Sequence, residues 1–270
     1  MTVKDIARAL AAAGIENAAF EARLLVSHFE GISMAEALTA EISKESFTSE
    51  ALATALSRRL QREPLAYITG KVGFYGEELS VTPDTLIPRA DTEILVEEAI
   101  KRLPKGAFFA DIGTGSGAIV LSVLKHRPDL SAIAVDISPA ALAVAKRNAK
   151  VLGALGRVHF LEADALEALP EEVTGAEAIL SNPPYIESAV IENLAPELAF
   201  EPTLALDGGA DGLSFYRAIL EKCTASLFLF EIGYNQAAAL MEMGRGHNFS
   251  VCVKQDFGGN DRVAILSKAD

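Results

Sequence analysis

The stretch 107–117, AFFADIGTGSG, decides the fold, because an apolar run is followed at once by a glycine-rich turn. Residues 118–125 then have a helical apolar pattern, so the turn lies between an expected strand and an expected helix. Glycine lets the backbone turn sharply and approach a ligand closely, and the following helix offers free N–H groups at its start. This order of strand, turn and helix predicts the ligand-binding edge of an α/β sheet.

The alternation of strand and helix continues after this stretch, with helical segments such as 139–152 between apolar runs. The runs that we expect to be strands are 132–137, 158–161, 178–180, 227–232, 249–254 and 263–268. Such an alternation predicts a parallel sheet covered by helices on both faces. The turn Gly258-Gly259-Asn260-Asp261 joins the last two runs, so we expect them to form an antiparallel hairpin at one side of the sheet.

The sequence before residue 71 has a different pattern of apolar residues. Residues 2–62 show helical patterning, in which Phe20, Leu24 and Leu25 make an apolar stripe. The segment Ser33-Met34-Ala35-Glu36 has the spacing of a capping box, which predicts a helix start. These features indicate a compact helical module that has no catalytic signature of its own.

Residues 71–90 are punctuated by glycines and prolines between short β-prone runs, which predicts a hairpin and an irregular connector. We therefore expect three parts in the chain. They are an N-terminal helical domain over 1–70, a β-hairpin connector over 71–90 and an α/β domain over 91–270.

Composition narrows the class of protein. The chain has 270 residues and a formal net charge of −13, which argues against affinity based on neutralising many phosphates. No apolar run approaches the length of roughly 18 residues that a membrane span needs. The two cysteines, Cys223 and Cys252, are far apart and make no disulfide framework or metal spacing. We expect a soluble, cytoplasmic protein without a bound metal.

Acidic residues follow the next two expected strands. Asp136 lies about 20 residues after the glycine turn, where an acid suits hydrogen bonding to a ribose diol. Ser138-Pro139 then predicts the N-cap and first position of a helix. Asp164, followed by Ala165, ends the third expected strand and is placed to meet an adenine amino group. The glycine turn alone would suit a nicotinamide or flavin enzyme as well as a methyltransferase, but together the three strand ends predict one nucleoside site.

The fourth expected strand leads into the tetrapeptide Asn182-Pro183-Pro184-Tyr185. An NPPY segment at a strand end, after a DIGTGSG loop, resembles the class I methyltransferases that modify amide or exocyclic amine nitrogen. The resemblance implies a Rossmann-like, seven-stranded α/β domain, with S-adenosylmethionine as methyl donor and S-adenosylhomocysteine as product. The cofactor-binding residues that it implies are Asp111, Gly113, Thr114, Gly115, Ser116, Gly117, Asp136, Asp164, Ala165 and Asn182.

The tetrapeptide suits methylation of a planar nitrogen. An amide nitrogen is a poor nucleophile, because its lone pair is delocalised into the carbonyl. The resemblance implies two acceptors, the Asn182 side-chain oxygen and the Pro183 backbone carbonyl, that hold the NH₂ hydrogens and aim the nitrogen at the methyl group. Proline fixes φ and removes a competing donor, which keeps these acceptors rigid. We expect Pro184 and Tyr185 to contact the flat substrate group, with the Tyr185 ring facing the cationic methyl.

Longer segments resemble one family of such enzymes, the peptide-chain release factor glutamine methyltransferases, also called HemK or PrmC. The segments are QREPLAYITG at 61–70, GFYG at 73–76, LIPRADTE at 86–93, EPTLAL at 201–206, GGADGL at 208–213, FYR at 215–217 and DFGGNDRV at 256–263. The resemblance implies N5-methylation of the glutamine in the Gly-Gly-Gln motif of bacterial class 1 release factors. It also implies that the N-terminal helices grip this protein substrate, with no membrane and no direct nucleic-acid partner.

The chain departs from the family pattern in one place. The family has proline and glutamate after the arginine of its LIPR segment, where this chain has Ala90 and Asp91. Because Asp91 keeps the charge, we expect a local adjustment and an unchanged activity. Arg89 and Glu93 are candidates for shaping the substrate entrance, and a surface ion pair that holds the connector is an equally good interpretation.

Three alternatives remain at this point. A ribosomal-protein glutamine methyltransferase is the closest, although its equivalent of 87–93 typically carries a serine and lacks the Thr-Glu pair found here. An N6-adenine methyltransferase of nucleic acid would need a target-recognition domain or a basic groove, and neither is evident. A non-catalytic binding protein would not need the intact segment Asn182 to Tyr185.

Overall fold

The structure is a computed structural model that describes residues 1–268 and divides into two compact units. The first unit consists of residues 1–71 together with the short segment 195–200. The second unit contains the rest of the described chain. Within the described residues, no helix is long and apolar enough to cross a membrane.

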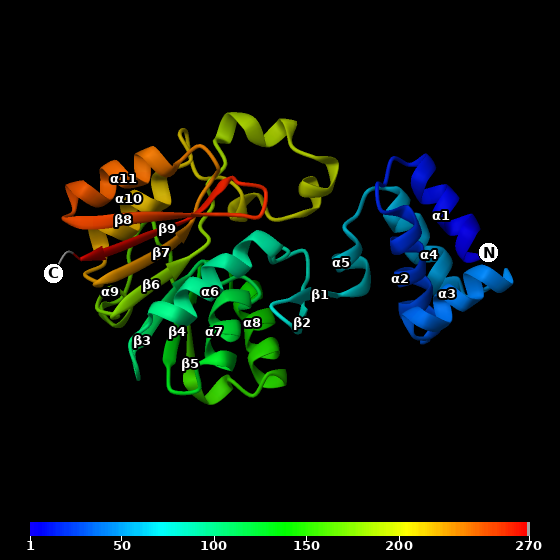
Figure 1. Ribbon diagram of the computed structural model, residues 1–270, viewed down its shortest axis with the longest axis horizontal. Coiled ribbons are helices and arrows are strands. Elements are labelled where there is room, and N and C mark those ends of the chain that lie inside the picture. The colour runs from blue at the N-terminus through cyan, green and yellow to red at the C-terminus, as the bar shows by residue number, and fades with distance from the viewer. Residues whose placement is uncertain (269–270) are drawn as a thin grey trace. The chain divides into compact units, whose positions relative to one another are not determined.

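The first unit is helical (Figure 1). Its helices are α1 (Val3–Ala12), α2 (Ala18–Glu30), α3 (Met34–Ser43), α4 (Glu50–Leu60) and α5 (Leu65–Thr69). The 3₁₀ turn Pro196–Phe200 belongs to the same unit. The predicted helix start at Ser33 is confirmed, since Ser33 Oγ accepts from the Glu36 N–H and Glu36 accepts from the Ser33 N–H. The same reciprocal pair, Thr2 with Asp5, begins α1 and satisfies N–H groups that the helix leaves free.

The predicted apolar stripe of α2 was wrong at Phe20 and right at Leu25. Phe20 is 51% exposed, whereas Ala18, Ala22 and Leu25 are buried. These three residues follow the i, i+4, i+7 spacing of one helix face, and Phe20 lies on the opposite side. Small alanines face the neighbouring helices and allow close packing, whereas Phe20 lies outside.

Two arginines hold the segment 195–200 within the first unit. The buried Arg59 binds Glu21 through two nitrogens, at 2.7 and 3.1 Å, and reaches Glu197 at 3.4 Å. Arg62 binds Glu197 at 2.8 Å and donates to the carbonyls of Ala13 and Gly14. The segment is therefore tied to the helices by charged groups that have lost most of their water.

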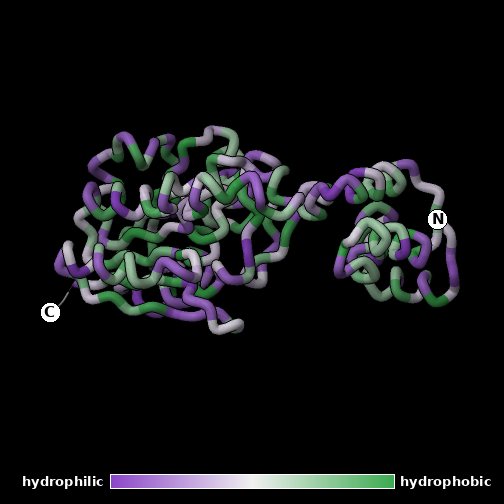
Figure 2. Tube along the Cα trace, turned by 90° about the horizontal axis from the view of Figure 1, so that it is seen from above, coloured by the Kyte–Doolittle hydropathy of each residue, from purple (hydrophilic) through white to green (hydrophobic). Residues whose placement is uncertain are grey.

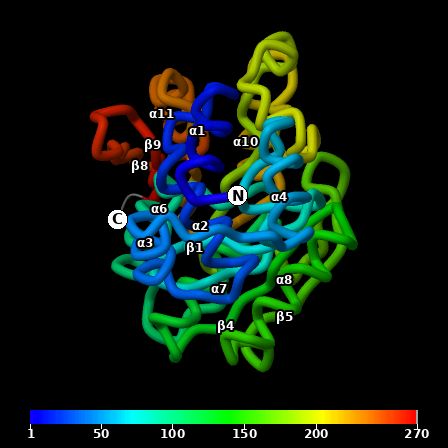
Figure 3. Tube along the Cα trace, turned by 90° about the vertical axis from the view of Figure 1, so that its right-hand side faces the viewer, coloured from blue at the N-terminus to red at the C-terminus, as the bar shows by residue number. Residues whose placement is uncertain are grey.

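The second unit is built on a seven-stranded sheet in the order β5-β4-β3-β6-β7-β9-β8. The strands are β3 (Phe108–Ile112), β4 (Ser131–Asp136), β5 (Val158–Glu162), β6 (Ala178–Ser181), β7 (Leu227–Glu231), β8 (Phe249–Gln255) and β9 (Asp261–Lys268). Strands β3 to β7 pair in parallel, and β9 pairs antiparallel with both β7 and β8. Both the predicted α/β class and the predicted terminal hairpin are confirmed. Figure 3 shows β5 and the β8–β9 pair at opposite borders of this unit.

Helices cover both faces of this sheet. They are α6 (Glu93–Arg102), α7 (Ala118–His126), α8 (Pro139–Val151), α9 (Glu171–Thr174), α10 (Ser214–Lys222) and α11 (Ala237–Gly246). Phe109 joins the core cluster beneath α6, α7 and α8, and its neighbour Ala110 joins the cluster beneath α9, α10 and α11. Because successive strand residues point to opposite faces, a strand buried on both faces is apolar throughout. Figure 2 shows hydrophobic stretches of chain inside this unit.

Residues 71–80 form a two-stranded hairpin, β1 (Lys71–Phe74) and β2 (Glu77–Ser80). Both turn residues, Tyr75 and Gly76, have positive φ, as the tight turns of twisted hairpins require. Asn148 on α8 holds β2 by accepting from the Ser80 N–H and donating to the Ser80 carbonyl. The following residues, 81–89, run without a helix or strand to the 3₁₀ turn Ala90–Thr92, which leads into α6.

Candidate active site

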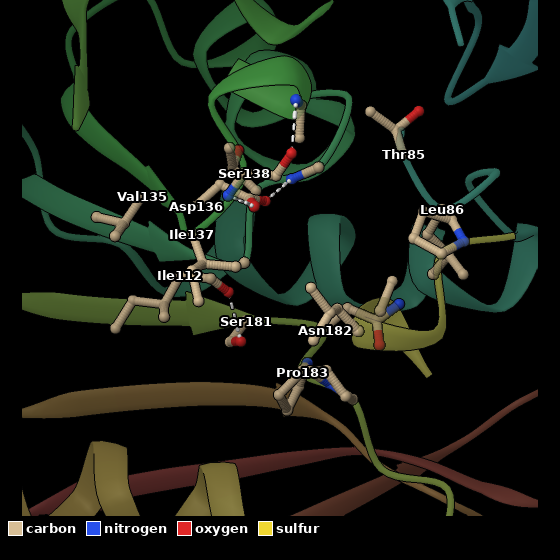
Figure 4. A pocket seen from close by; sticks show the side chains of 18 of the residues that line it. Thr85, Leu86, Ile112, Val135, Asp136, Ile137, Ser138, Ser181, Asn182 and Pro183 are labelled. Atoms are coloured by element: carbon tan, nitrogen blue, oxygen red, sulfur yellow. Dashed lines mark hydrogen bonds between the residues drawn. The ribbon is translucent and has the colours of Figure 1, made fainter. Parts of the chain in front are cut away.

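A pocket of about 360 Å³ opens at the carboxyl ends of β3, β4 and β6. The glycine turn, the ends of β4 and β5 and the tetrapeptide after β6 contribute to its lining, and residues 83–86 close another side (Figure 4). In a parallel α/β sheet, ligands bind beyond the carboxyl ends of the strands, where the chain leaves the hydrogen-bonded sheet. The structure thus brings the sequence-predicted segments together at one edge.

The glycine turn is held against the neighbouring strand. The N–H groups of Gly113 and Thr114 both donate to the carbonyl of Val135, at 2.8 and 2.9 Å. Gly113, Gly115 and Gly117 all have positive φ, so side chains would strain the turn. At Gly117 a Cβ would also lie 2.9 Å from Leu121 Cδ1 in the first turns of α7 and 3.3 Å from Ala145 Cβ on α8, so little room is left for a side chain there.

Asp111 lies behind the turn and does not line the pocket. Its Oδ2 accepts from Thr114 Oγ1 at 2.7 Å and from the Val120 N–H at 3.3 Å. Its Oδ1 is buried and has no hydrogen-bond partner within residues 1–268. Burial raises the pKa of Asp111 to about 7, against the lowering effect of these hydrogen bonds. A donor reaching Oδ1 would therefore favour the ionised form.

Asp136 lines the pocket at the end of β4 (Figure 4). One carboxylate oxygen accepts from the Ser138 N–H at 2.9 Å, and the other accepts from the Gly115 N–H at 2.8 Å. Burial raises its pKa above the usual range, and these backbone hydrogen bonds oppose the rise. Each oxygen keeps a further lone pair, so the carboxylate can still accept from a ligand hydroxyl.

Asp164 and Ala165 line the same pocket after β5. Asp164 Oδ1 accepts from the Leu166 N–H at 2.8 Å, which fixes the carboxylate in a tight turn. The predicted N-cap at Ser138 is also present, since its hydroxyl accepts from the Ala141 N–H with Pro139 at the first helical position. Rigid turns therefore follow both β4 and β5.

Residues of the tetrapeptide face two directions. Asn182, Pro183 and Pro184 line the pocket. Tyr185 instead packs against the core beneath α10, with its hydroxyl 3.5 Å from Glu231 Oε1. Burial raises the pKa of Tyr185 to about 12, so the phenol stays protonated. Tyr185 is not among the residues that line the pocket, so the expected contact between its ring and the substrate stays a prediction.

Close packing holds the backbone of the tetrapeptide. Gln236 Nε2 donates to the Tyr185 carbonyl at 3.0 Å. A Cβ on Gly212 would overlap the same oxygen, and a Cβ on Gly208 would lie 2.8 Å from the Pro184 carbonyl oxygen. The GGADGL segment is therefore glycine-rich because it passes directly over this backbone.

Sequence reasoning missed two polar residues beside Asn182. The Asn182 Nδ2 donates to Thr92 Oγ1 at 3.3 Å, and Thr92 Oγ1 donates to Glu231 Oε2 at 2.5 Å. Thr92 lines the pocket, and Glu231 is the last residue of β7. The signal for Glu231 was the one that located Asp136 and Asp164, an acid at the carboxyl end of an apolar strand.

Arg89 and Glu93 lie outside the pocket lining. Arg89 forms an ion pair with Glu201, a buried carboxylate that also accepts from the Ile87 N–H at 3.1 Å. Glu93 accepts from the Tyr75 N–H at 2.7 Å and so ties the hairpin turn to the start of α6. Asp91, at the departure from the family pattern, lies 3.3 Å from Arg262. These contacts fix the segment that carries Thr92.

Two family models match the chain, the PrmC N-terminal domain over residues 2–70 and the methyltransferase small domain over residues 90–207. A release factor glutamine methyltransferase of Geobacter sulfurreducens is 41% identical, over 94% of this chain and 91% of its own length. One from Cereibacter sphaeroides is 42% identical, over 94% and 92% respectively. The match thus extends over both units.

A solved structure of the hMettl16 catalytic domain, in complex with an RNA hairpin, has a TM-score of 0.56. It covers 82% of this chain and 83% of its own, at 13% identity, which shows the fold alone. The curated relatives are far more similar in sequence and share almost the full length. The chain belongs to the release factor glutamine methyltransferase family.

Proposed function

We propose that the protein methylates N5 of the glutamine in the Gly-Gly-Gln motif of bacterial class 1 peptide-chain release factors. Its relatives named release factor glutamine methyltransferase match nearly the whole chain. The observation that carries the proposal is that Asn182 and Pro183 line the same pocket as Asp136 and Asp164. Acceptors suited to an amide NH₂ therefore lie beside acceptors suited to a nucleoside.

The polar groups of this pocket fit S-adenosylmethionine, which supplies an electrophilic methyl group on a sulfonium. Asp136 would accept from the ribose hydroxyls and Asp164 from the adenine amino group. The glycine turn lets the backbone approach the ligand, and the helix after it begins at the pocket. The unpaired Oδ1 of Asp111 is a further acceptor next to this turn.

The residues of the tetrapeptide would bind and orient the glutamine amide. Asn182 Oδ1 and the Pro183 carbonyl each accept one N–H, which places the nitrogen lone pair toward the methyl group. As positive charge develops on this nitrogen, both hydrogen bonds strengthen, so they stabilise the transition state more than the ground state. Transfer forms the N–CH₃ bond, breaks the S–CH₃ bond and releases S-adenosylhomocysteine. The surplus proton then leaves to water, so no strong base is needed.

The other residues expected at the substrate have supporting roles in this proposal. Pro184 lines the pocket and offers a flat apolar surface. Tyr185, whose ring packs against the core outside the pocket lining, would act on the substrate group indirectly, by keeping the backbone of the tetrapeptide in place. Arg89 and Glu93 would shape the entrance indirectly, by holding the segment between the hairpin and α6.

We assign recognition of the release factor to the helical part, residues 1–70, with 71–90 as connector and 91–270 as the catalytic part. The match to the PrmC N-terminal domain supports this assignment. Exposed apolar side chains on α2 and α3 also support it, since Phe20, Leu38 and Ile42 are 51%, 45% and 73% exposed. Contiguous apolar surface in water commonly marks a protein-binding site, and we propose that these side chains contribute to one.

A nucleic acid is not the substrate in this proposal. The net charge of −13 disfavours a surface that neutralises many phosphates. A glutamine on a ribosomal protein is the nearer alternative, because the same acceptors would suit it. We place the reaction in the cytoplasm, where release factors act.

The test is incubation with radiolabelled S-adenosylmethionine and, in separate reactions, a class 1 release factor, a ribosomal protein fraction and DNA or RNA. We expect label on the release factor alone. Mass spectrometry of its Gly-Gly-Gln peptide should show one added methyl on the glutamine. A release factor with alanine in place of that glutamine is the matched control and should stay unlabelled. Label on ribosomal protein or nucleic acid only would overturn the proposal.

A further inference from the structure

The side-chain amide of Asn182 can face the pocket in two ways. One rotamer presents the oxygen, which accepts a hydrogen bond, and a half-turn about the last bond presents the NH₂ instead. The amide nitrogen of a glutamine substrate carries two hydrogens. The first orientation offers it an acceptor, whereas the second places the Asn182 NH₂ against the substrate NH₂, and two donors repel each other. The proposed chemistry therefore requires that something fixes this choice before the substrate binds.

Hydrogen-bond counting fixes the choice through Thr92. An ionised carboxylate accepts only, so the single hydroxyl hydrogen of Thr92 goes to Glu231 Oε2 at 2.5 Å. Thr92 Oγ1 can then only accept from its other neighbour, which is Asn182 at 3.3 Å. The Asn182 Nδ2 must face Thr92, and Oδ1 is left to the pocket.

Secondary structure makes this chain of hydrogen bonds rigid. Ser181 and Phe230 are paired in the register of β6 and β7, so the next residues, Asn182 and Glu231, follow side by side. Thr92, at the start of α6, is far from both in the sequence and forms a hydrogen bond with each of them. Thr92 and Glu231 are only 3% and 2% exposed, so water does not compete for these hydrogen bonds.

We propose that Thr92 and Glu231 are positioning residues, which hold the Asn182 amide oxygen toward the substrate nitrogen through the chain Glu231–Thr92–Asn182. The inference deepens the proposed function and rests on it. Neither positioning residue touches the reacting atoms, so each acts on the reaction only through Asn182.

The protonation state of Glu231 sets the direction of the hydrogen bonds that link Glu231, Thr92 and Asn182. A protonated Glu231 can donate to Thr92, which frees the Thr92 hydroxyl to donate to the amide oxygen and lets the amide turn over. Burial raises the pKa of Glu231 to about 7. Asp91, before α6, also raises it, while Arg262 on β9 and the hydroxyls of Thr92 and Tyr185 lower it. Tyr216 on α10 donates to the Glu231 backbone carbonyl and carries no charge. Orientation should therefore be lost as pH falls below about 7.

The test compares Thr92→Val, which removes the hydroxyl and keeps the shape, with Thr92→Ser, which restores the hydroxyl. At saturating release factor and cofactor, Thr92→Val should lower kcat by roughly 10- to 100-fold, as expected for loss of one hydrogen bond to a charged group. Thr92→Ser should stay within about threefold of the parent enzyme, and the cofactor Kd should be unchanged in both. Thr174→Val, at a threonine outside the site, is the matched control and should leave kcat unchanged.

The pH profile separates positioning from mere packing. The kcat of the parent enzyme should fall below about pH 7, whereas the kcat of Glu231→Gln, whose amide does not titrate, should be independent of pH across that range. The control Glu98→Gln changes another buried glutamate, on α6, and should keep the parent profile. If Thr92→Ser is as slow as Thr92→Val, or if Glu231→Gln keeps the acid limb, the inference is wrong.

A measurement on the parent enzyme tests the inference even if the Thr92 and Glu231 variants do not fold. With ¹⁵N-labelled asparagine, the Asn182 side-chain NH₂ resonance is assigned by its absence in Asn182→Asp. This resonance should move between about pH 6 and pH 8 in step with the ¹³C titration of Glu231. A resonance that stays fixed while Glu231 titrates would overturn the inference. Failure to methylate a release factor would defeat the proposed function and leave this result standing.

Discussion

Asp136 and Gly115 are joined at the edge of the pocket by a 2.8 Å hydrogen bond from the glycine N–H to the carboxylate. The other oxygen of the same carboxylate accepts from the Ser138 N–H at 2.9 Å. One acid therefore fixes the glycine turn after β3 and the helix start after β4. This double task holds the charged group half-buried at the strand end.

The first prediction concerns this carboxylate. Asp136→Asn offers one acceptor and one donor, so one of the two backbone N–H groups faces an NH₂ and the ribose loses an acceptor. We expect the Kd for S-adenosylmethionine to rise by roughly 10- to 100-fold, which isothermal titration calorimetry would measure. Asp129→Asn is the matched control, since Asp129 also accepts from a backbone N–H, that of Gly106, but before the start of β4. An unchanged Kd in Asp136→Asn would contradict the assigned ribose contact.

The second prediction concerns Asn182. Asn182→Ala removes the amide oxygen and should lower kcat by about a hundredfold or more, because this hydrogen bond strengthens in the transition state. The cofactor Kd should stay within about threefold, since the strand-end acids remain. Single-turnover methylation of a release factor measures the first quantity and calorimetry the second. Asn193→Ala, at an exposed asparagine further along the loop, should behave as the parent enzyme. Normal turnover by Asn182→Ala would remove the mechanism.

Strand and helix positions in the second unit could be predicted because hydrophobic periodicity there agrees with the tertiary structure. The run 107–112 was expected as a strand, and the strand observed is Phe108–Ile112. Asp136 and Asp164 were located by the rule that strand ends meet at one edge, and both line the pocket. The helix α2 was misread because burial there follows small alanines, which periodicity weighs less than a phenylalanine.

The rest of the site could not be predicted because it depends on contacts between distant segments. Thr92 and Glu231 are 139 residues apart, and no spacing in the sequence indicates that their side chains meet. Glu201 similarly reaches Ile87 and Arg89 from 114 and 112 residues away. Such pairs follow only from the strand order, which places β7 beside β6 and the start of α6 near both.

The third prediction separates two reasons for glycine. Gly117 has φ +82° and a Cβ there would lie 2.9 Å from Leu121 Cδ1, whereas Gly153 has φ +68° and open space around it. Gly153→Ala should therefore cost only the left-handed backbone penalty, about 1 kcal/mol of unfolding free energy. Gly117→Ala should cost about 2–4 kcal/mol, because overpacking against the side chains of Leu121 and Ala145 adds to that penalty. Urea unfolding with a common slope would measure both. Equal losses would show that the close contact is relieved without cost.

The last prediction concerns stability as a function of pH. Burial raises the folded-state pKa of Asp111 from 3.8 and that of Glu231 from 4.5, each to about 7. An acid whose pKa is raised by folding binds its proton more tightly in the folded state. Its contribution to the free energy of unfolding is therefore fully present below the unfolded pKa and is lost as pH rises through the folded pKa. The unfolding free energy should therefore fall between about pH 4 and pH 7 by a few kcal/mol and then level off. Glu231→Gln or Asp111→Asn should each flatten this fall, as urea unfolding at a series of pH values would show. Saturating cofactor should flatten the Asp111 part in particular, if a ligand donor meets its unpaired oxygen. A slope of opposite sign, with the parent enzyme gaining stability toward pH 7, would mean that both carboxylates are ionised in the folded protein and that other groups compensate their burial.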